Sequence, residues 1–219
     1  MLPDLQHVEQ ILGGPLALSL RIAGAEEPLS ESLLSAGERS RHGRLSTARR
    51  RRAWLLGRAA LKGLLRRMGE EEDTAKLSFP HPRYSLTHSG VWAVAVGAPA
   101  GDLLGIGVDL ELSGTPRPEA ARFFLTPEEQ DWAAALPAGR QEGGLRRLWT
   151  VKEALFKSDP DNNCRTLSDY RIENPAAVSG IAFSGPEGRI MRYAGVGFSG
   201  GLLSVAVLLN EEVSGCLSN

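Results

Sequence analysis

Residues 103–111 constrain the fold of this chain more than any other segment. They read Leu-Leu-Gly-Ile-Gly-Val-Asp-Leu-Glu, an apolar run that ends in two acids. Successive side chains of a β-strand point to opposite faces, so Asp109 and Glu111, two residues apart, would point to the same face. The segment therefore predicts a strand that ends in a pair of neighbouring carboxylates. Such a pair is costly unless a cation lies close by.

A second segment, residues 149–157, would add an acid and a base. Glu153 and Lys157 are four residues apart in a sequence with helical character, so they would share one face of a helix. Carboxylate oxygens suit Mg²⁺ or Mn²⁺, whereas Zn²⁺ would favour His or Cys, and the chain has no cluster of either. Because Mg²⁺ is usually held by a few carboxylates together with phosphate and water, three acids would imply a phosphorylated ligand. On spacing alone, a solvated strand end beside a helical salt bridge explains the same residues.

The pattern of apolar residues predicts a chain of two halves with similar element order, divided between residues 102 and 103. Helix starts are expected at 28–30 and 35–38 and at Thr126, where Pro127 would occupy the first helical position. A loop is expected at 139–144, where glycines are frequent. The helices expected are 47–68 and 145–157, and the strands are 15–23, 84–88, 91–96, 103–111, 168–172, 177–183, 189–196 and 201–209.

Charge is distributed unevenly along the chain. The 219 residues carry a formal net charge of -1, yet residues 39–67 contain eleven Lys or Arg and no Asp or Glu. This basic segment suits phosphates, nucleic acid or an acidic protein, and it is equally compatible with a solvated helix face. Nucleic acid is the less persuasive partner, because Trp54 is the only aromatic residue among these arginines and no zinc-finger or RNA-recognition signature is present. A phosphate-binding P-loop is also missing.

The expected location is the cytoplasm. Cys164 and Cys216 are too few for a disulfide framework, and Asp4 and Glu9 stand where a signal peptide would be basic and then apolar. No apolar run reaches the roughly 18 residues of a membrane span. We therefore expect a reduced, cytoplasmic protein with no membrane contact.

Four blocks, taken in order, resemble the surfactin-synthetase-type 4'-phosphopantetheinyl transferases. The blocks are Thr-His-Ser at 87–89, Gly-Val-Asp-Leu-Glu at 107–111, Phe-Phe-Leu-Thr-Pro-Glu-Glu at 123–129 and Trp-Thr-Val-Lys-Glu-Ala-Leu-Phe-Lys at 149–157. The resemblance extends upstream through the basic segment and covers about residues 34–172. One departure is the absence of the family's Gly-Lys/Arg-Pro loop before Thr87, where this chain has Phe-Pro-His-Pro-Arg at 79–83.

The resemblance implies an α+β pseudo-dimer in which coenzyme A binds between the halves 1–102 and 103–219. It implies transfer of 4'-phosphopantetheine from coenzyme A to a serine of an apo acyl or peptidyl carrier protein, with release of adenosine 3',5'-bisphosphate. Since one chain would contain both halves, we expect a monomer. A magnesium-dependent phosphodiester hydrolase that uses the same acids without a carrier protein is the alternative.

The resemblance also assigns roles to individual residues. Asp109, Glu111 and Glu153 would bind Mg²⁺, or Mn²⁺ in its place. Glu153 would accept the serine proton, directly or through a metal-bound water, and Lys157 would stabilise the developing negative charge. Acidic carrier proteins would be attracted by the basic segment. Residues 123–125 have two interpretations. The favoured one is that all three belong to the core, and the other is that some of them face the carrier. The residues expected to contact the coenzyme A phosphates are Arg41, Arg50, Arg83, Thr87, His88 and Lys152.

Overall fold

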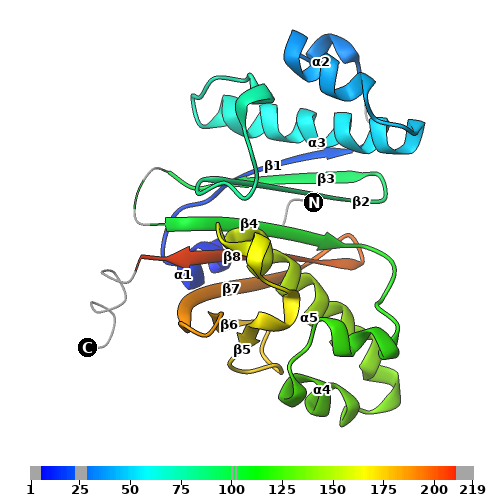
Figure 1. The fold of residues 1–219 in the computed structure, drawn as a ribbon, viewed down its shortest axis with the longest axis vertical. Helices are drawn as coiled ribbons and strands as arrows, with labels where there is room; N and C mark the ends of the chain where they lie inside the picture. Colours follow the sequence, from blue (N-terminus) through cyan, green and yellow to red (C-terminus); the bar gives the residue numbers. More distant parts are fainter. Residues whose placement is uncertain (1–5, 23–28, 100, 102, 211–219) are drawn as a thin grey trace.

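Two antiparallel sheets form the centre of the protein. In the computed structural model, which describes residues 6–22, 29–99, 101 and 103–210, a three-stranded sheet has the order β1-β3-β2 and a five-stranded sheet has the order β4-β8-β7-β6-β5 (Figure 1). The first sheet contains β1 (Ala17–Ile22), β2 (Tyr84–Ser89) and β3 (Trp92–Gly97). The second contains β4 (Leu103–Glu111), β5 (Tyr170–Ile172), β6 (Ser179–Ser184), β7 (Arg189–Phe198) and β8 (Gly201–Leu209).

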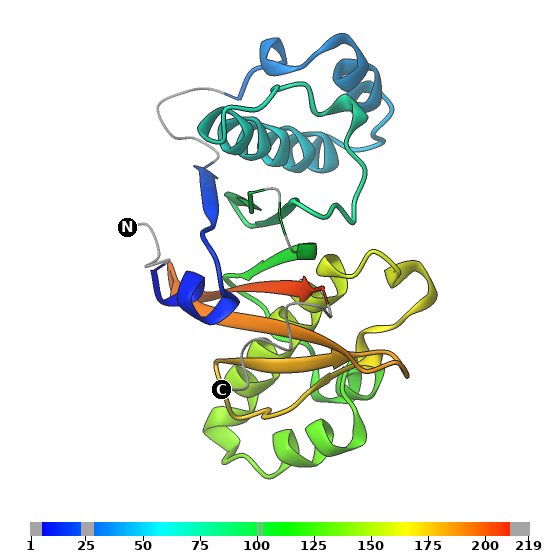
Figure 2. The same cartoon turned by 90° about the vertical axis from the view of Figure 1, so that its left-hand side faces the viewer.

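Each sheet is covered by one long helix, α3 (Ala48–Arg67) on the first and α5 (Ala138–Ser158) on the second (Figures 1 and 2). Alternation along β3 shows how the layers pack: Ala93 and Ala95 pack with α3, whereas Val94 and Val96 pack with residues of β4 and β8. The chain thus stacks a helix, a sheet, a second sheet and a second helix. The expected α+β class is confirmed. The remaining helices are α1 (Gln6–Leu12), α2 (Ala36–Gly43) and α4 (Pro127–Ala134), with short 3₁₀ turns η1 (Glu31–Leu33), η2 (Thr74–Lys76), η3 (Pro118–Phe123), η4 (Asn162–Cys164) and η5 (Leu167–Asp169).

Capping residues begin the helices where the sequence predicted. The Ser35 hydroxyl accepts from the Glu38 N–H and the Glu38 carboxylate accepts from the Ser35 N–H, which is a reciprocal capping box. Thr126 and Glu129 form the same arrangement at α4, with Pro127 in the first helical position. Of the predicted start at 28–30, Ser30 caps η1, while residue 28 lies outside the described residues, as do residue 23 of the first expected strand and Asp4 and Cys216.

Two features differ from the expectation. The predicted loop at 139–144 is wrong, because these residues form the first turns of α5. A Cβ on Gly144 would lie 2.5 Å from Leu136 Cδ1, so this glycine allows α5 to pack closely against the chain that leaves α4. The unpredicted helix α1 buries Val8 and Leu12 against β7 and β8, so this helix packs on the second sheet. No helix within the described ranges has the length and apolar character to cross a bilayer.

Candidate active site

Strand β4 and helix α5 bring four of the predicted residues together. Ile106, Val108 and Leu110 point into the core between the sheets, which leaves Asp109 and Glu111 on the face toward α5. Lys157 Nζ lies 2.6 Å from Asp109 Oδ1 and 3.8 Å from Glu153 Oε2. The site therefore combines three carboxylates from two elements with one ammonium group between two of them.

A tryptophan on the same helix holds the third carboxylate. Trp149 Nε1 donates to Glu111 Oε1 over 3.3 Å, and the Trp149 ring meets Phe124 edge to face at 5.1 Å between centroids. Phe124 and Leu125 are buried, whereas 67 % of Phe123 is exposed. The structure thus divides the 123–125 trio: two residues are core, and the first faces outward.

Strand β2 lies against β4 through a row of hydroxyl side chains. Thr87 Oγ1 donates to Asp109 Oδ1 over 3.1 Å. The hydroxyls of Ser85 and Ser89, two residues to either side, accept from the backbone N–H groups of Val108 and Leu112. These side chains satisfy the free edge of β4 and place the first half of the chain directly beside the carboxylates.

Asp109 is the most constrained of the three acids. Its side chain is almost completely buried, and Oδ1 receives hydrogen bonds from both Thr87 and Lys157. Its second oxygen, Oδ2, is buried and has no hydrogen-bond partner among the residues that the structure describes. Buried polar atoms are nearly always partnered, so an orphaned carboxylate oxygen is a position suited to a cation.

The two glutamates carry the electrostatic strain of this arrangement. Burial, and next the negative charge of Asp109, raise the pKa of Glu111, against the Trp149 hydrogen bond and the Lys157 charge. Burial also raises the pKa of Glu153; Lys157 opposes this and Asp109 adds to it. One lysine therefore does not fully compensate three carboxylates.

The donor set fits a hard divalent cation in its chemistry, because it consists of carboxylate oxygens and includes Asp109 Oδ2, which no described residue hydrogen-bonds. However, in the described part of the chain no three His, Cys, Asp or Glu residues are grouped closely enough to form a ready-made metal centre. Magnesium binding stays a prediction.

The predicted phosphate-binding residues are spread over several places. Arg41, Arg50 and His88 are exposed. Leu86 packs beneath Gly57 of α3, and the part of α3 that precedes Gly57 runs toward the His88 end of β2 (Figure 1). Arg83 lies at the opposite end of the strand, where its Nη2 is 2.6 Å from Glu70 Oε1.

Lys152 does not join the site. Its side chain is completely buried, with Nζ 2.6 Å from Glu129 Oε2 and a hydrogen bond to the Tyr170 carbonyl. Burial lowers its pKa, and the partner Glu129 opposes that shift. An ammonium group held in this way is not free to contact a bound phosphate.

Other contacts escaped the sequence analysis. Buried Glu38 pairs with Lys62 at 2.9 Å and fixes α2 on α3. Glu38 directly precedes the acid-free segment 39–67, and an acid beside so many bases could have predicted a buried ion pair. The Arg58 guanidinium lies 4.9 Å from the Trp54 ring centroid and 6.0 Å from that of Phe79. This cation-aromatic cluster includes Phe79, so it lies at the 79–83 segment, which differs from the loop of the transferase family.

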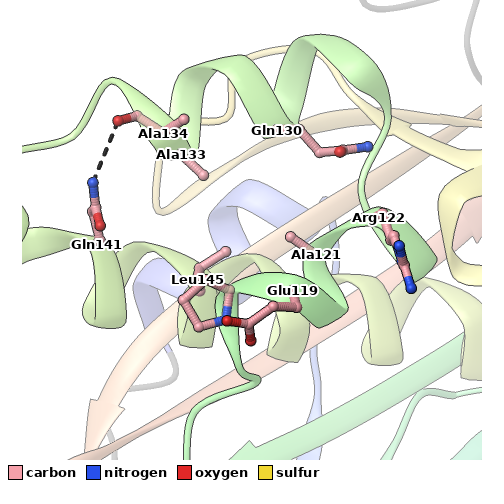
Figure 3. Close-up of a pocket in the computed structure, with 9 residues that line it drawn as sticks. Glu119, Ala121, Arg122, Gln130, Ala133, Ala134, Gln141 and Leu145 are labelled. Carbon is pink, nitrogen blue, oxygen red and sulfur yellow. Dashed lines mark hydrogen bonds between the residues drawn. The ribbon is translucent and has the colours of Figure 1, made fainter.

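A hollow on the second half lies between η3, α4 and α5 (Figure 3). It has a volume of about 530 Å³, and its lining mixes apolar and polar groups, among them Leu145, Glu119 and Arg122. Gln141 closes one side by donating to the Ala134 carbonyl over 3.3 Å. None of the carboxylates of the β4–α5 site lines it.

Comparison with known proteins identifies the class to which this site is similar. Residues 105–189, which include Asp109, Glu111, Glu153 and Lys157, match the model of the 4'-phosphopantetheinyl transferase superfamily. The resemblance is confirmed for the three blocks that lie within this stretch, at 107–111, 123–129 and 149–157.

A curated relative gives the same class. Over 79 residues the chain is 38% identical to the 4'-phosphopantetheinyl transferase psf-1 of Bacillus pumilus. The matched stretch covers 36% of this chain and 32% of the relative. The match thus spans about a third of the length of that protein.

Proposed function

We propose that this protein transfers 4'-phosphopantetheine from coenzyme A to a serine of an apo acyl or peptidyl carrier protein and releases adenosine 3',5'-bisphosphate. The observation that carries the proposal is the meeting of Asp109, Glu111, Glu153 and Lys157 at the junction of β4 and α5. All four lie within the stretch that is similar to the transferase superfamily.

Asp109, Glu111 and Glu153 would hold Mg²⁺, with Mn²⁺ as a substitute. The support is the oxygen-only donor set and the buried Asp109 Oδ2, which has no hydrogen-bond partner among the described residues. When bound, the cation offsets the negative charge of the coenzyme A pyrophosphate.

Glu153 and Lys157 are the residues proposed to act on the reacting groups. The serine oxygen forms a bond to the phosphorus that carries pantetheine, and the bond from that phosphorus to the adenosine bisphosphate breaks. Glu153 takes the serine proton, directly or through a water; burial raises its pKa and so makes it a better proton acceptor once ionised. Lys157, already beside Asp109, stabilises the negative charge on the transferred group.

Coenzyme A would lie across the junction of the two halves, between the His88 end of β2 and the β4 carboxylates. Exposed Arg41, Arg50 and His88 are the proposed phosphate contacts. Thr87 contributes by orienting Asp109. Arg83 and Lys152 are held by Glu70 and Glu129 and are better explained as structural. We further expect a cytoplasmic monomer.

The test is mass spectrometry of an apo carrier protein incubated with coenzyme A, Mg²⁺ and this protein. The carrier should gain the mass of phosphopantetheine on one serine. Glu153→Gln should slow the gain by about 100-fold or more, the range expected for loss of a general base. The matched control is Glu142→Gln. Glu142 is an exposed acid on the same helix, and it pairs with Arg146 away from the carboxylate site.

Two outcomes would contradict the proposal. One is that no apo carrier gains mass when this protein is assayed with a panel of carriers from fatty-acid, polyketide and peptide synthesis. The other is cleavage of coenzyme A at the same rate with and without carrier, which would indicate the hydrolase alternative.

A further inference from the structure

The face of β4 that looks toward α5 carries Gly105, Gly107, Asp109 and Glu111 in succession. A Cβ placed on Gly107 would lie 1.9 Å from the Ala154 carbonyl oxygen and 2.7 Å from the Ser158 nitrogen. The atoms are backbone atoms of the helix, so they cannot turn aside as a side chain does.

Gly105 makes the same contact one step earlier on the strand. A Cβ there would lie 1.9 Å from the Ser158 carbonyl oxygen and 2.9 Å from its carbonyl carbon. Helix backbone therefore rests on strand backbone at two successive positions of this face. Elsewhere on α5 the contact is different: at Gly144 the nearest atom is the flexible end of Leu136.

The contact falls on the part of α5 that carries the site. The turn from Ala154 to Ser158 begins one residue after Glu153 and contains Lys157. Lys157 reaches Asp109, which is two residues beyond Gly107 on the same strand face, over 2.6 Å. The depth at which α5 sits on the glycines thus sets the distance over which its charged groups meet the β4 acids.

We propose that Gly105 and Gly107 are positioning residues that hold α5 close enough for Lys157, which also pairs with Glu153, to reach Asp109. Ordinary contact for a Cβ begins at 3.4 Å, so alanine at either position requires α5 to move outward by about 1.5 Å. A shift of that size separates an ion pair whose atoms are 2.6 Å apart. The inference rests on the proposed function only in the role given to the carboxylates, since the positioning itself is argued from distances.

The test measures the coupling between Asp109 and Lys157 through urea unfolding of the full chain, without coenzyme A, carrier protein or divalent metal. Asp109→Asn, Lys157→Met and the double variant form a cycle that isolates their pairwise free energy. The cycle is measured in the wild-type background, with Gly107→Ala, and with Gly144→Ala as the control. The coupling should be present in wild type, retained with Gly144→Ala and lost with Gly107→Ala.

A rescue variant separates positioning from general packing. Asp109→Glu adds one methylene and reaches farther toward α5. It should restore stability in the Gly107→Ala background and lower stability in the wild-type background. A role in packing alone predicts the same effect of Asp109→Glu in both.

Several results would overturn the proposal. Full coupling in Gly107→Ala is one, and absence of rescue by Asp109→Glu is another. Should Gly107→Ala fail to fold, Gly105→Ala in the same cycle decides. If neither glycine variant folds while Gly144→Ala does, the glycines serve the packing of the whole second half, and the specific role is refuted. Because no substrate is used, these outcomes are independent of whether the protein transfers phosphopantetheine.

Discussion

At the scale of single residues, the two carboxylate oxygens of Asp109 differ in their hydrogen bonds. Oδ1 accepts from Thr87 of β2 and from Lys157 of α5, while Oδ2 has no partner within the described residues. Two donors on one oxygen fix the orientation of the carboxylate. The free oxygen is thereby presented in a constant direction, which is what a cation site requires.

Thr87→Val tests the hydroxyl contribution to this orientation. A hydrogen bond to a charged group contributes about 1.5–3 kcal/mol, so the variant should lose about 2 kcal/mol of unfolding free energy. Thr87→Ser keeps the hydroxyl and should lose less than about 1 kcal/mol. Urea unfolding of both variants provides the measurement. Equal stability of Thr87→Val and wild type would show that the hydrogen bond to Asp109 is not formed.

At the scale of elements, α5 presents different chemistry on neighbouring faces. Consecutive residues of a helix are about 100° apart, so Lys152 and Glu153 point in different directions. Glu153 faces the β4 acids, and Lys152 is buried with Glu129 of α4 and the Tyr170 carbonyl of β5. One helix thus positions the site and also joins α4 and β5 to the core.

Lys152→Met tests that structural role. The substitution leaves Glu129 buried without its cation, and breaking a buried pair costs about 3–5 kcal/mol of unfolding free energy. For the fraction that remains folded, the KM for coenzyme A should match that of wild type. A variant with normal stability and a KM raised tenfold would instead support the phosphate contact predicted from the sequence.

The segment that leads into β2 contains a histidine whose ring accepts a backbone hydrogen bond. His81 Nδ1 accepts from the Arg83 N–H over 3.1 Å, and its ring stacks on Tyr84 at 4.7 Å between centroids. Burial, and next the positive charge of Arg83, lower the pKa of His81 below its ordinary 6.5, against the charge of Glu70. The folded protein therefore binds a proton at this ring more weakly than the unfolded chain does.

The sign of the pH dependence follows from this difference. As pH falls through and below 6.5, the unfolded chain takes up a proton that the folded state resists, so the unfolding free energy should decrease. His81→Asn keeps a neutral acceptor and should remove this part of the slope between about pH 7.5 and pH 5. Unfolding curves of both proteins across that range provide the measurement. An unchanged slope in the variant would contradict the assignment to His81.

At the scale of the whole molecule, positive charge is concentrated on one end. The net charge is -1, yet the eleven basic residues of 39–67 lie on α2, α3 and the segment between them. Arg50 is exposed near the start of α3, whereas Arg66 near its end pairs with Glu72 at 2.8 Å. Long-range attraction of an acidic partner should therefore depend on the first residue more than on the second.

The rate of transfer to the carrier tests this attraction. The kcat/KM for an acidic carrier should fall several-fold between about 50 mM and 300 mM salt, because the screening length shortens. Arg50→Ala, measured at saturating coenzyme A, should reduce both the rate at low salt and the salt dependence. Arg66→Ala, which removes an already paired charge, should change them less. A rate independent of salt would argue against steering by this surface.

The sequence by itself determined several elements and the faces they present, although not α1 or the first turns of α5. Strand β4 matches its predicted bounds, and Thr47 and Thr126 cap the helices that were expected to begin there. Side-chain alternation placed Asp109 and Glu111 together, and helical spacing placed Glu153 beside Lys157. These features depend on dihedral preference, capping and periodicity, which act within a few residues.

Only the tertiary structure decided how the charges are shared. Lys157 meets Asp109 across 48 positions of sequence and Thr87 meets it across 22, while Lys152 and Arg83, expected at the ligand, are held by Glu129 and Glu70. The choice among many acids for each base follows from which elements pack together and which atoms they exclude from water. Packing of this kind, including the backbone contact at Gly107, depends on the whole chain and leaves no local pattern to read.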